Sequence, residues 1–302
     1  MQQMPNNNFL LSEADGWICA LAPAKVNLFL HITGRRENGY HEIESVFAFT
    51  KFGDKVRVRP DDKLSLKITG EFGHLLNQEN LDGNLVIKAA LALKEYVGRD
   101  DLGAEIVLEK NLPIAAGIGG GSSDAAATLR ALIRLWNVEI PKADLMSLAL
   151  ELGADVPACL HPQTSFVSGI GEQVKEITLP ANYGCVLVNS GHELSTAQVF
   201  KLYSEMNVEF SQTINDVGLC ASEKWLVDVA RNDLLASAVK ACPEVEVVLQ
   251  TFERFDQAIL SRMSGSGATC FTLTKTMADA KLLAETLQSE HPSWWVQATE
   301  FV

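Results

Sequence analysis

Several features that would decide a protein's class are missing from this sequence. Its 302 residues contain no run of 18 apolar residues, so the sequence predicts no membrane-spanning helix. The start, MQQMPNNNFLLSEADGW, lacks the basic and apolar regions of a secretory signal, and it lacks the Arg typical of organellar transit peptides. Residues 1–16 are therefore predicted to be a loose polar tail, and the protein is expected to be cytoplasmic.

Paired cysteines and a positive charge balance are missing too. The six cysteines are far apart and form no CxxC pair, which is typical of reduced core thiols, and no metal-ligating residue is predicted. The formal net charge is −13 and the pI about 4.9. This acidic balance disfavours binding to nucleic acid or anionic membrane, which needs clustered Lys and Arg. A small anionic substrate is not excluded, because a few cations and backbone amides suffice to bind phosphate.

The chain is long enough for one large domain or two smaller ones. Strand-like runs occupy about residues 17–69, and helical spacing follows from Leu85, with Asn84 as a candidate cap and Gly98 as a stop. Beyond about Gly171 the pattern of strands and helices restarts. No Pro- or Ser-rich linker separates the two parts. Domains of residues 1–171 and 172–302 are thus predicted from the pattern alone.

A glycine-rich segment, GIGGGSSDAAA from Gly117 to Ala127, follows a predicted strand and opens a predicted helix. A tight turn with a serine cap would explain one or two glycines. Four glycines with two serines favour an anion-binding loop, because glycine lets a ligand approach the backbone and a helix N-terminus attracts phosphate. No Lys-Ser/Thr pair follows, which excludes a Walker A loop, and Ser122 replaces the third glycine of the dinucleotide fingerprint.

Two segments offer candidate catalytic side chains. Lys25 and Asn27 lie two apart in a predicted strand, so both face one side, either a solvated edge or a functional site. Asp155, in LGADVPACL, could simply cap the short helical turn that follows. If Asp155 instead approached Lys25, a carboxylate beside an ammonium near a γ-phosphate could orient and deprotonate an alcohol. Beside a Lys⁺, the Asp155 carboxylate would act as a weak base or mainly position the hydroxyl.

Together with the preceding LPIAA, the glycine segment resembles the phosphate loop of the GHMP kinases. The resemblance extends from about residue 20 to the C-terminus through APAKVNLFLHITGRRENGYHEIESVF, LGADVPACL, RNDLLASA and MSGSGATCFTL, in the family's order and spacing. It implies a two-domain α+β fold with an N-terminal domain like ribosomal protein S5 and a C-terminal ferredoxin-like α/β sandwich. It also implies phosphoryl transfer from ATP, with Mg²⁺, to an alcohol of a small molecule.

The same resemblance implies roles for individual residues. It places Lys25 and Asp155 in catalysis and assigns Asn84 to the adenine of ATP. The residues implied along the ATP phosphates are Pro113, Ile114, Ala115, Ala116, Gly117, Ile118, Gly119, Gly120, Gly121, Ser122 and Ser123. Asn84 is equally well explained as a helix cap.

Substrate contacts are implied for Asn27, Tyr40, His41 and Phe200. Tyr40 and His41 match residues that hold a cytosine, and Phe200 matches an aromatic residue on the other side of that base. An aromatic face suits a pyrimidine, and a ring nitrogen can pair with its polar edge. The implied substrate therefore carries a cytidine diphosphate group. Because Asn38-Gly39 is a turn signal, Tyr40 and His41 could also be exposed hairpin residues.

Other functions remain open at this point. One is a different small-molecule GHMP kinase, of the homoserine or mevalonate type, and another is a non-catalytic ATP-binding sensor with the same fold. A dinucleotide-dependent oxidoreductase is disfavoured by the broken fingerprint. The expected partner is the small-molecule substrate, with no nucleic acid and no membrane, and a weak homodimer is possible. Asp124 and the Ala115-Ala116 pair depart from the family's pattern, which leaves the shape of the loop open.

Overall fold

A computed structural model describes residues 10–76 and 83–302 of the chain. These residues form two compact units, each assembled from separate segments. Unit 1 comprises Met1–Pro23, Gly53–Leu112 and Gly120–His161, and unit 2 comprises Ala24–Phe52, Pro113–Gly119 and Pro162–Val302. The domain boundary predicted between residues 171 and 172 stays a prediction.

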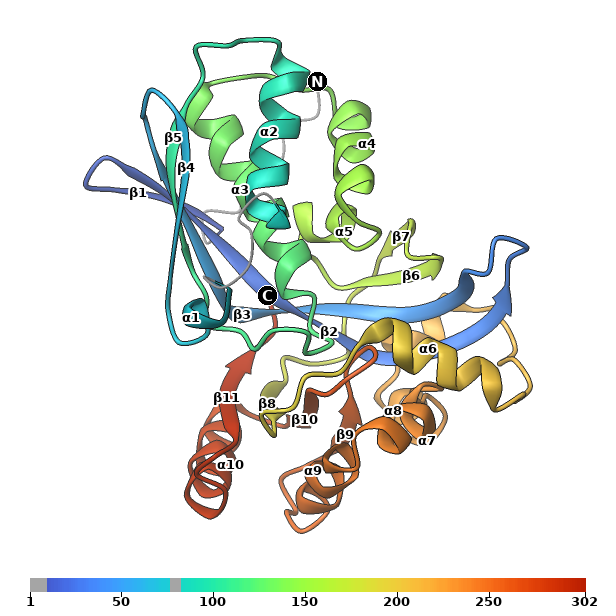
Figure 1. The fold of residues 1–302 in the computed structure, drawn as a ribbon. Coiled ribbons are helices and arrows are strands. Elements are labelled where there is room, and N and C mark those ends of the chain that lie inside the picture. The colour runs from blue at the N-terminus through green and yellow to red at the C-terminus, as the bar shows by residue number, and fades with distance from the viewer. Residues whose placement is uncertain (1–9, 77–82) are drawn as a thin grey trace. The chain divides into compact units, whose positions relative to one another are not determined.

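The strands of unit 1 follow the order β1-β2-β3-β5-β4 (Figure 1). The unit holds residues 17–23 of β2 (Trp17–Arg35) and residues 53–59 of β3 (His41–Arg59). β5 pairs with β3 antiparallel and with β4 parallel. The remaining strands of this unit are β1 (Leu11–Ala14), β4 (Leu64–Thr69) and β5 (Ala104–Glu109).

The predicted polar tail is wrong for Leu11–Ala14, which form strand β1 and pair antiparallel with β2. The turn between the strands is Asp15-Gly16, with φ of 51° and 77°. Two successive residues with positive φ match the right-handed twist of a hairpin, and Asp-Gly is a favoured pair for such a turn. Residues 1–9 of the predicted tail lie outside the described residues.

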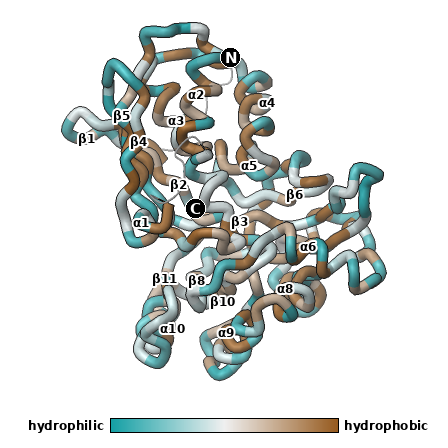
Figure 2. The backbone as a smooth tube through the Cα atoms, viewed as in Figure 1, coloured by the Kyte–Doolittle hydropathy of each residue, from teal (hydrophilic) through white to brown (hydrophobic). Residues whose placement is uncertain are grey.

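Three long helices of unit 1 lie side by side (Figure 1). Asn84 caps α2 by accepting a hydrogen bond from the backbone N–H of Val86, and Gly98 ends it in the left-handed conformation. Both terminal residues are those predicted. Buried alanines and leucines let α3 pack closely, and Figure 2 shows hydrophobic stretches along α2 and α3. The helices are α1 (Gly73–Leu76), α2 (Leu85–Val97), α3 (Gly120–Trp136), α4 (Lys142–Leu152) and α5 (Val156–Leu160).

Unit 2 contains two groups of strands. Residues 41–52 of β3 lie in this unit, where β6 (Ser165–Gly169) pairs with β3 and β7 (Gln173–Glu176) pairs with β6. A separate antiparallel sheet has the order β11-β8-β10-β9. Its strands are β8 (Gly184–Asn189), β9 (Leu260–Met263), β10 (Cys270–Thr274) and β11 (Trp295–Glu300).

Helices cover this sheet and bury a core with it. Val186 and Val188 of β8 share one buried cluster with Phe252 of α9 and Leu283 and Leu287 of α10. The helical elements of unit 2 are α6 (Thr196–Glu205), the 3₁₀ helix η2 (Val217–Ala221), α7 (Glu223–Asp228), α8 (Leu235–Ala241), α9 (Glu244–Phe252) and α10 (Met277–Glu290). Within residues 10–76 and 83–302, no helix has both the length and the apolar character needed to cross a membrane.

Candidate active site

The predicted phosphate loop is shared between the two units. Residues Pro113–Gly119 belong to unit 2, and α3 of unit 1 begins at Gly120. The sequence pattern predicted a helix that begins at Ser123, and the observed helix begins three residues earlier. The backbone N–H groups of its first turn have no carbonyl partner four residues earlier within the helix, so they can bind an anion.

Two glycines of the loop are required by the chain's own packing in unit 2. Gly117 has φ of 73°, and a Cβ there would lie 2.5 Å from the carbonyl oxygen of Ser264. Gly119 has φ of 65°, and its Cβ would lie 3.0 Å from side-chain carbons of Lys25. A side chain at Gly117 would collide with the Ser264 carbonyl, and one at Gly119 would force the Lys25 side chain to shift, whether or not a ligand is bound.

The loop Ser264–Gly267 holds the unit 2 part of the glycine segment in place. The Ser264 hydroxyl donates to the carbonyl of Gly117 at 3.0 Å and accepts from the backbone N–H of Asn27 at 3.1 Å. The backbone N–H of Thr269, just beyond this loop, donates to the carbonyl of Ala116. SGSG is therefore more than a connection between β9 and β10, because it bonds to the residues predicted to hold phosphate.

Lys25 and Asn27 are buried neighbours in unit 2, with exposed fractions of 5% and 1%. The Lys25 ammonium donates to Asn27 Oδ1 at 3.0 Å and lies 3.8 Å from the centre of the Phe47 ring. Asn27 Nδ2 donates to the hydroxyl of Ser45 at 2.9 Å. This burial excludes the solvated edge that the sequence left open. A buried ammonium held by an amide oxygen and a ring face has a fixed position, as phosphate binding requires.

Asp155 lies in unit 1, between α4 and α5. It occupies the N-cap position of α5, yet within the described residues its side chain makes no capping hydrogen bond. Capping therefore does not account for the carboxylate. The segment is fixed by α3, since Arg130 donates to the carbonyl of Cys159 at 2.6 Å and Ser123 donates to the Cys159 sulfur at 3.4 Å.

Two of the residues predicted to bind the substrate meet in unit 2. The His41 ring lies 5.2 Å from the Phe200 ring, at an interplanar angle of 30°. Tyr203 contacts His41 edge-on, and the hydroxyl of Ser204 lies 3.3 Å from His41 Nε2. Sequence reasoning missed Tyr203 and Ser204, although they follow Phe200 at the three- and four-residue spacing of one helix face.

Tyr40 and His41 differ in their surroundings. Tyr40 is 62% exposed after a turn in which Asn38 Oδ1 accepts from its backbone N–H. Burial lowers the pKa of His41, and the charge of Arg35 lowers it further. His41 is thus neutral near pH 7 and offers one donor and one acceptor nitrogen. An exposed aromatic face beside a neutral imidazole suits a pyrimidine base.

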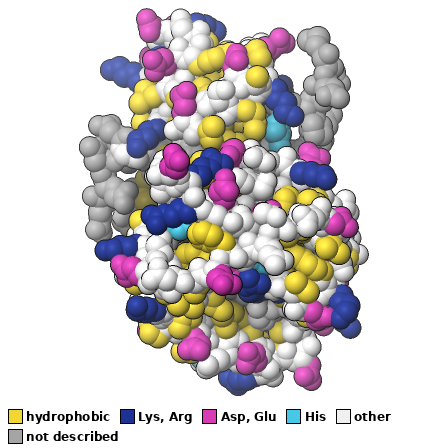
Figure 3. Space-filling view, turned by 90° about the vertical axis from the view of Figure 1, so that its right-hand side faces the viewer, with side chains coloured by type: hydrophobic (Ala, Val, Ile, Leu, Met, Phe, Trp, Pro, Cys, Tyr) yellow, Lys and Arg dark blue, Asp and Glu magenta, His cyan; other side chains and the backbone are white. Residues whose placement is uncertain are grey.

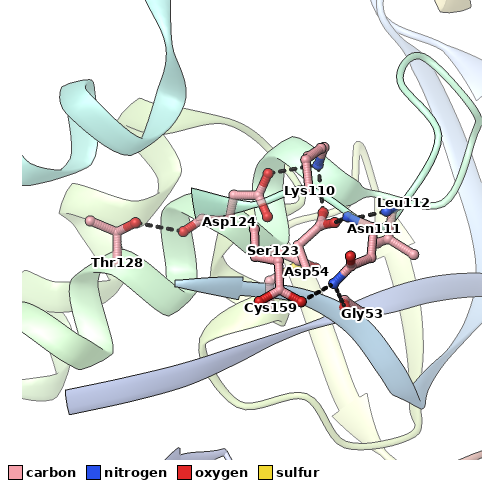
Figure 4. A network of polar contacts seen from close by, with 10 residues as sticks. Gly53, Asp54, Lys110, Asn111, Leu112, Ser123, Asp124, Thr128 and Cys159 are labelled. Atoms are coloured by element: carbon pink, nitrogen blue, oxygen red, sulfur yellow. Dashed lines mark hydrogen bonds and ion pairs between the residues drawn. The ribbon is translucent and has the colours of Figure 1, made fainter. Parts of the chain in front are cut away.

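A buried network at the start of α3 escaped sequence reasoning altogether (Figure 4). The Lys110 ammonium lies between two carboxylates of unit 1, 2.5 Å from Asp54 Oδ2 and 2.7 Å from Asp124 Oδ2. Asp54 Oδ1 also accepts from the backbone N–H groups of Asn111 and Leu112. Asp124, which departs from the family's pattern, is therefore part of a structural network. The sequence signal for this network was Lys110, a charged residue directly after the mostly buried strand β5.

This network also explains Gly120, the first residue of α3. A Cβ at Gly120 would lie 3.0 Å from the Lys110 ammonium. Burial by itself lowers the pKa of Lys110, but the charges of Asp124 and Asp54 outweigh it, and the pKa rises above its ordinary value. Burial raises the pKa of Asp124 well above the ordinary value, and the charge of Asp54 raises it further. Among the described residues, Asp124 Oδ1 has no hydrogen-bond partner.

Two models of the GHMP kinases match separate regions of this chain. The model described as GHMP kinases N terminal domain matches residues 84–163, and GHMP kinases C terminal matches residues 211–293. The chain belongs to the GHMP kinase family. The resemblance stated from the sequence and the predicted two-domain α+β fold are thereby confirmed.

Several similar curated relatives within this family all carry the same name. Proteins named 4-diphosphocytidyl-2-C-methyl-D-erythritol kinase from Rhizobium etli (strain CIAT 652) and Rhizobium leguminosarum bv. trifolii (strain WSM2304) are 42% and 43% identical, each over 97% of both chains. A crystal structure titled 4-(cytidine 5'-diphospho)-2C-methyl-D-erythritol kinase matches with a TM-score of 0.77 and 32% identity, covering 94% of this chain and 98% of the other. A mevalonate kinase of Methanococcus jannaschii, with a TM-score of 0.68 and 13% identity over 96% and 100% of the two chains, shares the fold alone.

Proposed function

We propose that this GHMP kinase transfers the γ-phosphoryl group of ATP to the 2-hydroxyl of 4-diphosphocytidyl-2-C-methyl-D-erythritol. The products are the 2-phosphate and ADP, in the non-mevalonate route to isoprenoid precursors. The observation that carries this function is the identity of about 40% with relatives of that name over nearly the whole chain. Kinases of the homoserine or mevalonate type are not favoured, because the solved structures of such kinases are less than 20% identical in sequence to this chain.

Phosphate binding falls to the glycine segment and the start of α3. Backbone N–H groups of Gly120, Gly121 and Ser122 attract the phosphates, with the positive end of the helix dipole behind them. Their donor chemistry fits a polyphosphate, and the rigid packing of Gly117 and Gly119 fixes the cradle. Mg²⁺, when bound with ATP, supplies charge neutralisation. We assign no ligand of this chain to Mg²⁺.

Catalysis falls to Lys25 and Asp155, which belong to different units. The buried Lys25 ammonium stabilises negative charge that develops on the transferred phosphoryl group. The Asp155 carboxylate orients the substrate hydroxyl and accepts its proton. Asn27 fixes Lys25 through the hydrogen bond to its Oδ1 and contacts the substrate.

The cytosine of the substrate binds at Tyr40, His41 and Phe200. Tyr40 stacks on the base, His41 pairs with its polar edge, and Phe200 bounds the site beside His41. Asn84 lies near the adenine of ATP in this scheme, in addition to capping α2. The protein acts in the cytoplasm on a small molecule, and a weak homodimer is compatible with this role. On the face drawn in Figure 3, cationic and anionic side chains are interspersed, which is unlike a nucleic-acid-binding surface.

A coupled assay of ADP release tests the proposed function. The purified protein with ATP and Mg²⁺ is offered the cytidyl substrate, homoserine, mevalonate or galactose in parallel. We expect turnover with the cytidyl substrate and inhibition by CMP or CDP. Turnover of mevalonate or homoserine, with no effect of cytidine nucleotides, would reject the proposal. ATP binding without turnover of any substrate would identify a sensor.

A further inference from the structure

Three side chains from two segments of unit 2 that are remote in the sequence meet at its surface. His192 follows β8, Cys242 follows α8, and Glu244 begins α9. Their ligand atoms all lie within 4.8 Å of one another. We propose that His192, Cys242 and Glu244 bind a thiophilic divalent metal ion of the Zn²⁺ class, with water completing the coordination.

Two of the three separations between ligand atoms match the edges of a tetrahedral site. Zn²⁺ binds sulfur at about 2.3 Å and nitrogen or oxygen at about 2.0–2.2 Å, so neighbouring ligand atoms of a tetrahedron lie roughly 3.3–3.7 Å apart. His192 Nε2 lies 3.7 Å from Glu244 Oε1, and Cys242 Sγ lies 3.4 Å from Glu244 Oε2. The third separation, between the ligand atoms of His192 and Cys242, is at most 4.8 Å.

The donor set selects the class of metal. A thiolate, an imidazole and a carboxylate suit Zn²⁺ and similar ions, whereas Mg²⁺ and Ca²⁺ prefer oxygen ligands. This site is therefore separate from any Mg²⁺ that accompanies ATP. His192 Nδ1 lies 3.1 Å from the Ser190 hydroxyl. A proton on Nδ1, donated to that hydroxyl, leaves the lone pair of Nε2 for the metal, an outer contact of the kind that orients metal-binding histidines.

Binding must displace a proton from Cys242. The Cys242 thiol is buried and donates to Glu244. Burial raises the pKa of Cys242, and the hydrogen bond to Glu244 raises it further. The thiol and the aqueous ion form the sulfur–metal bond, and one proton leaves to solvent.

The site would clamp a segment that contacts the glycine loop. Two residues after His192, the backbone N–H of Leu194 donates to the carbonyl of Ala115, and Thr196 Oγ1 bonds to the hydroxyl of Ser266. All of these residues belong to unit 2. A metal joining His192 to the start of α9 would hold residues 190–196 against that unit and raise its thermal stability.

Metal titration of the full-length, untagged, chelator-treated protein tests this proposal without any activity readout. Calorimetry with Zn²⁺ should show one site whose affinity falls about 10-fold or more in His192→Ala and Glu244→Gln. Co²⁺ in place of Zn²⁺ should give a near-ultraviolet sulfur-to-metal band that is absent in Cys242→Ser. The matched controls, Cys19→Ser and His74→Ala, should leave both signals unchanged.

His192 is exposed, so His192→Ala removes a proposed ligand without disturbing the core. This variant should therefore fold like the wild type. Binding that is equal in the wild type and His192→Ala, or a Co²⁺ spectrum without the sulfur band, would overturn the proposal. In that case the three side chains are only a hydrogen-bonded cluster at the start of α9.

Discussion

Lys25 shows how a single residue acquires its significance from its surroundings. In the sequence it lies two residues before Asn27, and a solvated edge strand and a functional site explained this pattern equally well. In unit 2 its ammonium is bonded to Asn27 and lies against the Phe47 ring, with Gly119 packed on its aliphatic chain. Burial of a charge is costly unless it is compensated, so a buried lysine with fixed contacts favours a function over a solvated face.

Replacing either catalytic candidate should abolish most of the activity. Asp155→Asn keeps the shape and removes the charge that orients and deprotonates the alcohol, so kcat should fall about 100- to 10,000-fold. Lys25→Met should reduce kcat to a similar extent, because the developing phosphoryl charge loses its cation. Steady-state kinetics with circular dichroism as a check on folding would measure this. Asp228→Asn and Lys51→Met on the surface are the matched controls, and near-normal turnover in Asp155→Asn would remove that residue from the mechanism.

Tyr40 should contribute to substrate binding and little to the chemical step. Its ring is mostly exposed, so Tyr40→Ala should leave the fold intact. Loss of base stacking should weaken binding by about 1–3 kcal/mol, seen as a higher KM with little change in kcat. Tyr40→Phe keeps the aromatic face and should behave like the wild type. An unchanged KM in the alanine variant would contradict the cytosine site.

At the scale of elements, local sequence signals were dependable wherever a helix begins or ends with a typical residue. Asn84 and Gly98 bound α2 as predicted, and Ser195 caps α6 by accepting from the backbone N–H of Gln198.

Strands β6 and β7 escaped prediction. Each is short, and β7 is exposed throughout. β6 pairs with β3, more than a hundred residues earlier, and β7 pairs only with β6, so the local pattern carried little information about either strand.

The network of Lys110, Asp54 and Asp124 anchors the first turn of α3, and unit 1 should depend on its cation. Lys110→Met would leave the buried Asp54 carboxylate without its cation, which should reduce the free energy of unfolding by about 3–5 kcal/mol. Urea unfolding would measure this loss. Arg134→Met, on the exposed part of α3, is the control. Equal stability of Lys110→Met and wild type would show that the ion pairs contribute nothing net.

The same network predicts a dependence of stability on pH. The folded-state pKa of Asp124 is raised, so its contribution is fully present below its unfolded pKa of about 3.9 and is lost as pH rises through the folded value. Asp124→Asn cannot ionise, so its free energy of unfolding should decline less than that of the wild type as pH rises from 4 to 8. Urea unfolding across this range measures the difference. Parallel curves for the two proteins would mean that Asp124 is ionised in the fold.

At the scale of the whole molecule, the chain crosses between its units several times. β2 and β3 each contribute residues to both units, and the glycine segment changes unit between Gly119 and Gly120. The family models match one region on each side of the predicted boundary, at residues 84–163 and 211–293. The position of Lys25 therefore depends on the folding of unit 2, and that of Asp155 on the folding of unit 1.

A double-variant cycle tests whether these residues act on one step. If Lys25 and Asp155 serve the same transition state, Lys25→Met combined with Asp155→Asn should lower kcat little further than either change alone. Independent roles would give effects that multiply. Single-turnover measurements of phosphoryl transfer would separate the two results. A multiplicative loss would contradict the proposal that the pair acts as a unit.

The sequence by itself determined the family, many of the helices and strands, and the residue types that suit phosphate and pyrimidine binding, because glycine loops, helix caps and strand periodicity are local features. Tertiary structure decided which of those residues are held together. The contact of His41 with Phe200, the burial of Lys25 and the network around Lys110 join segments that are far apart along the chain. Such contacts depend on how side chains fill space and compensate buried charge, and these are properties of the packed chain.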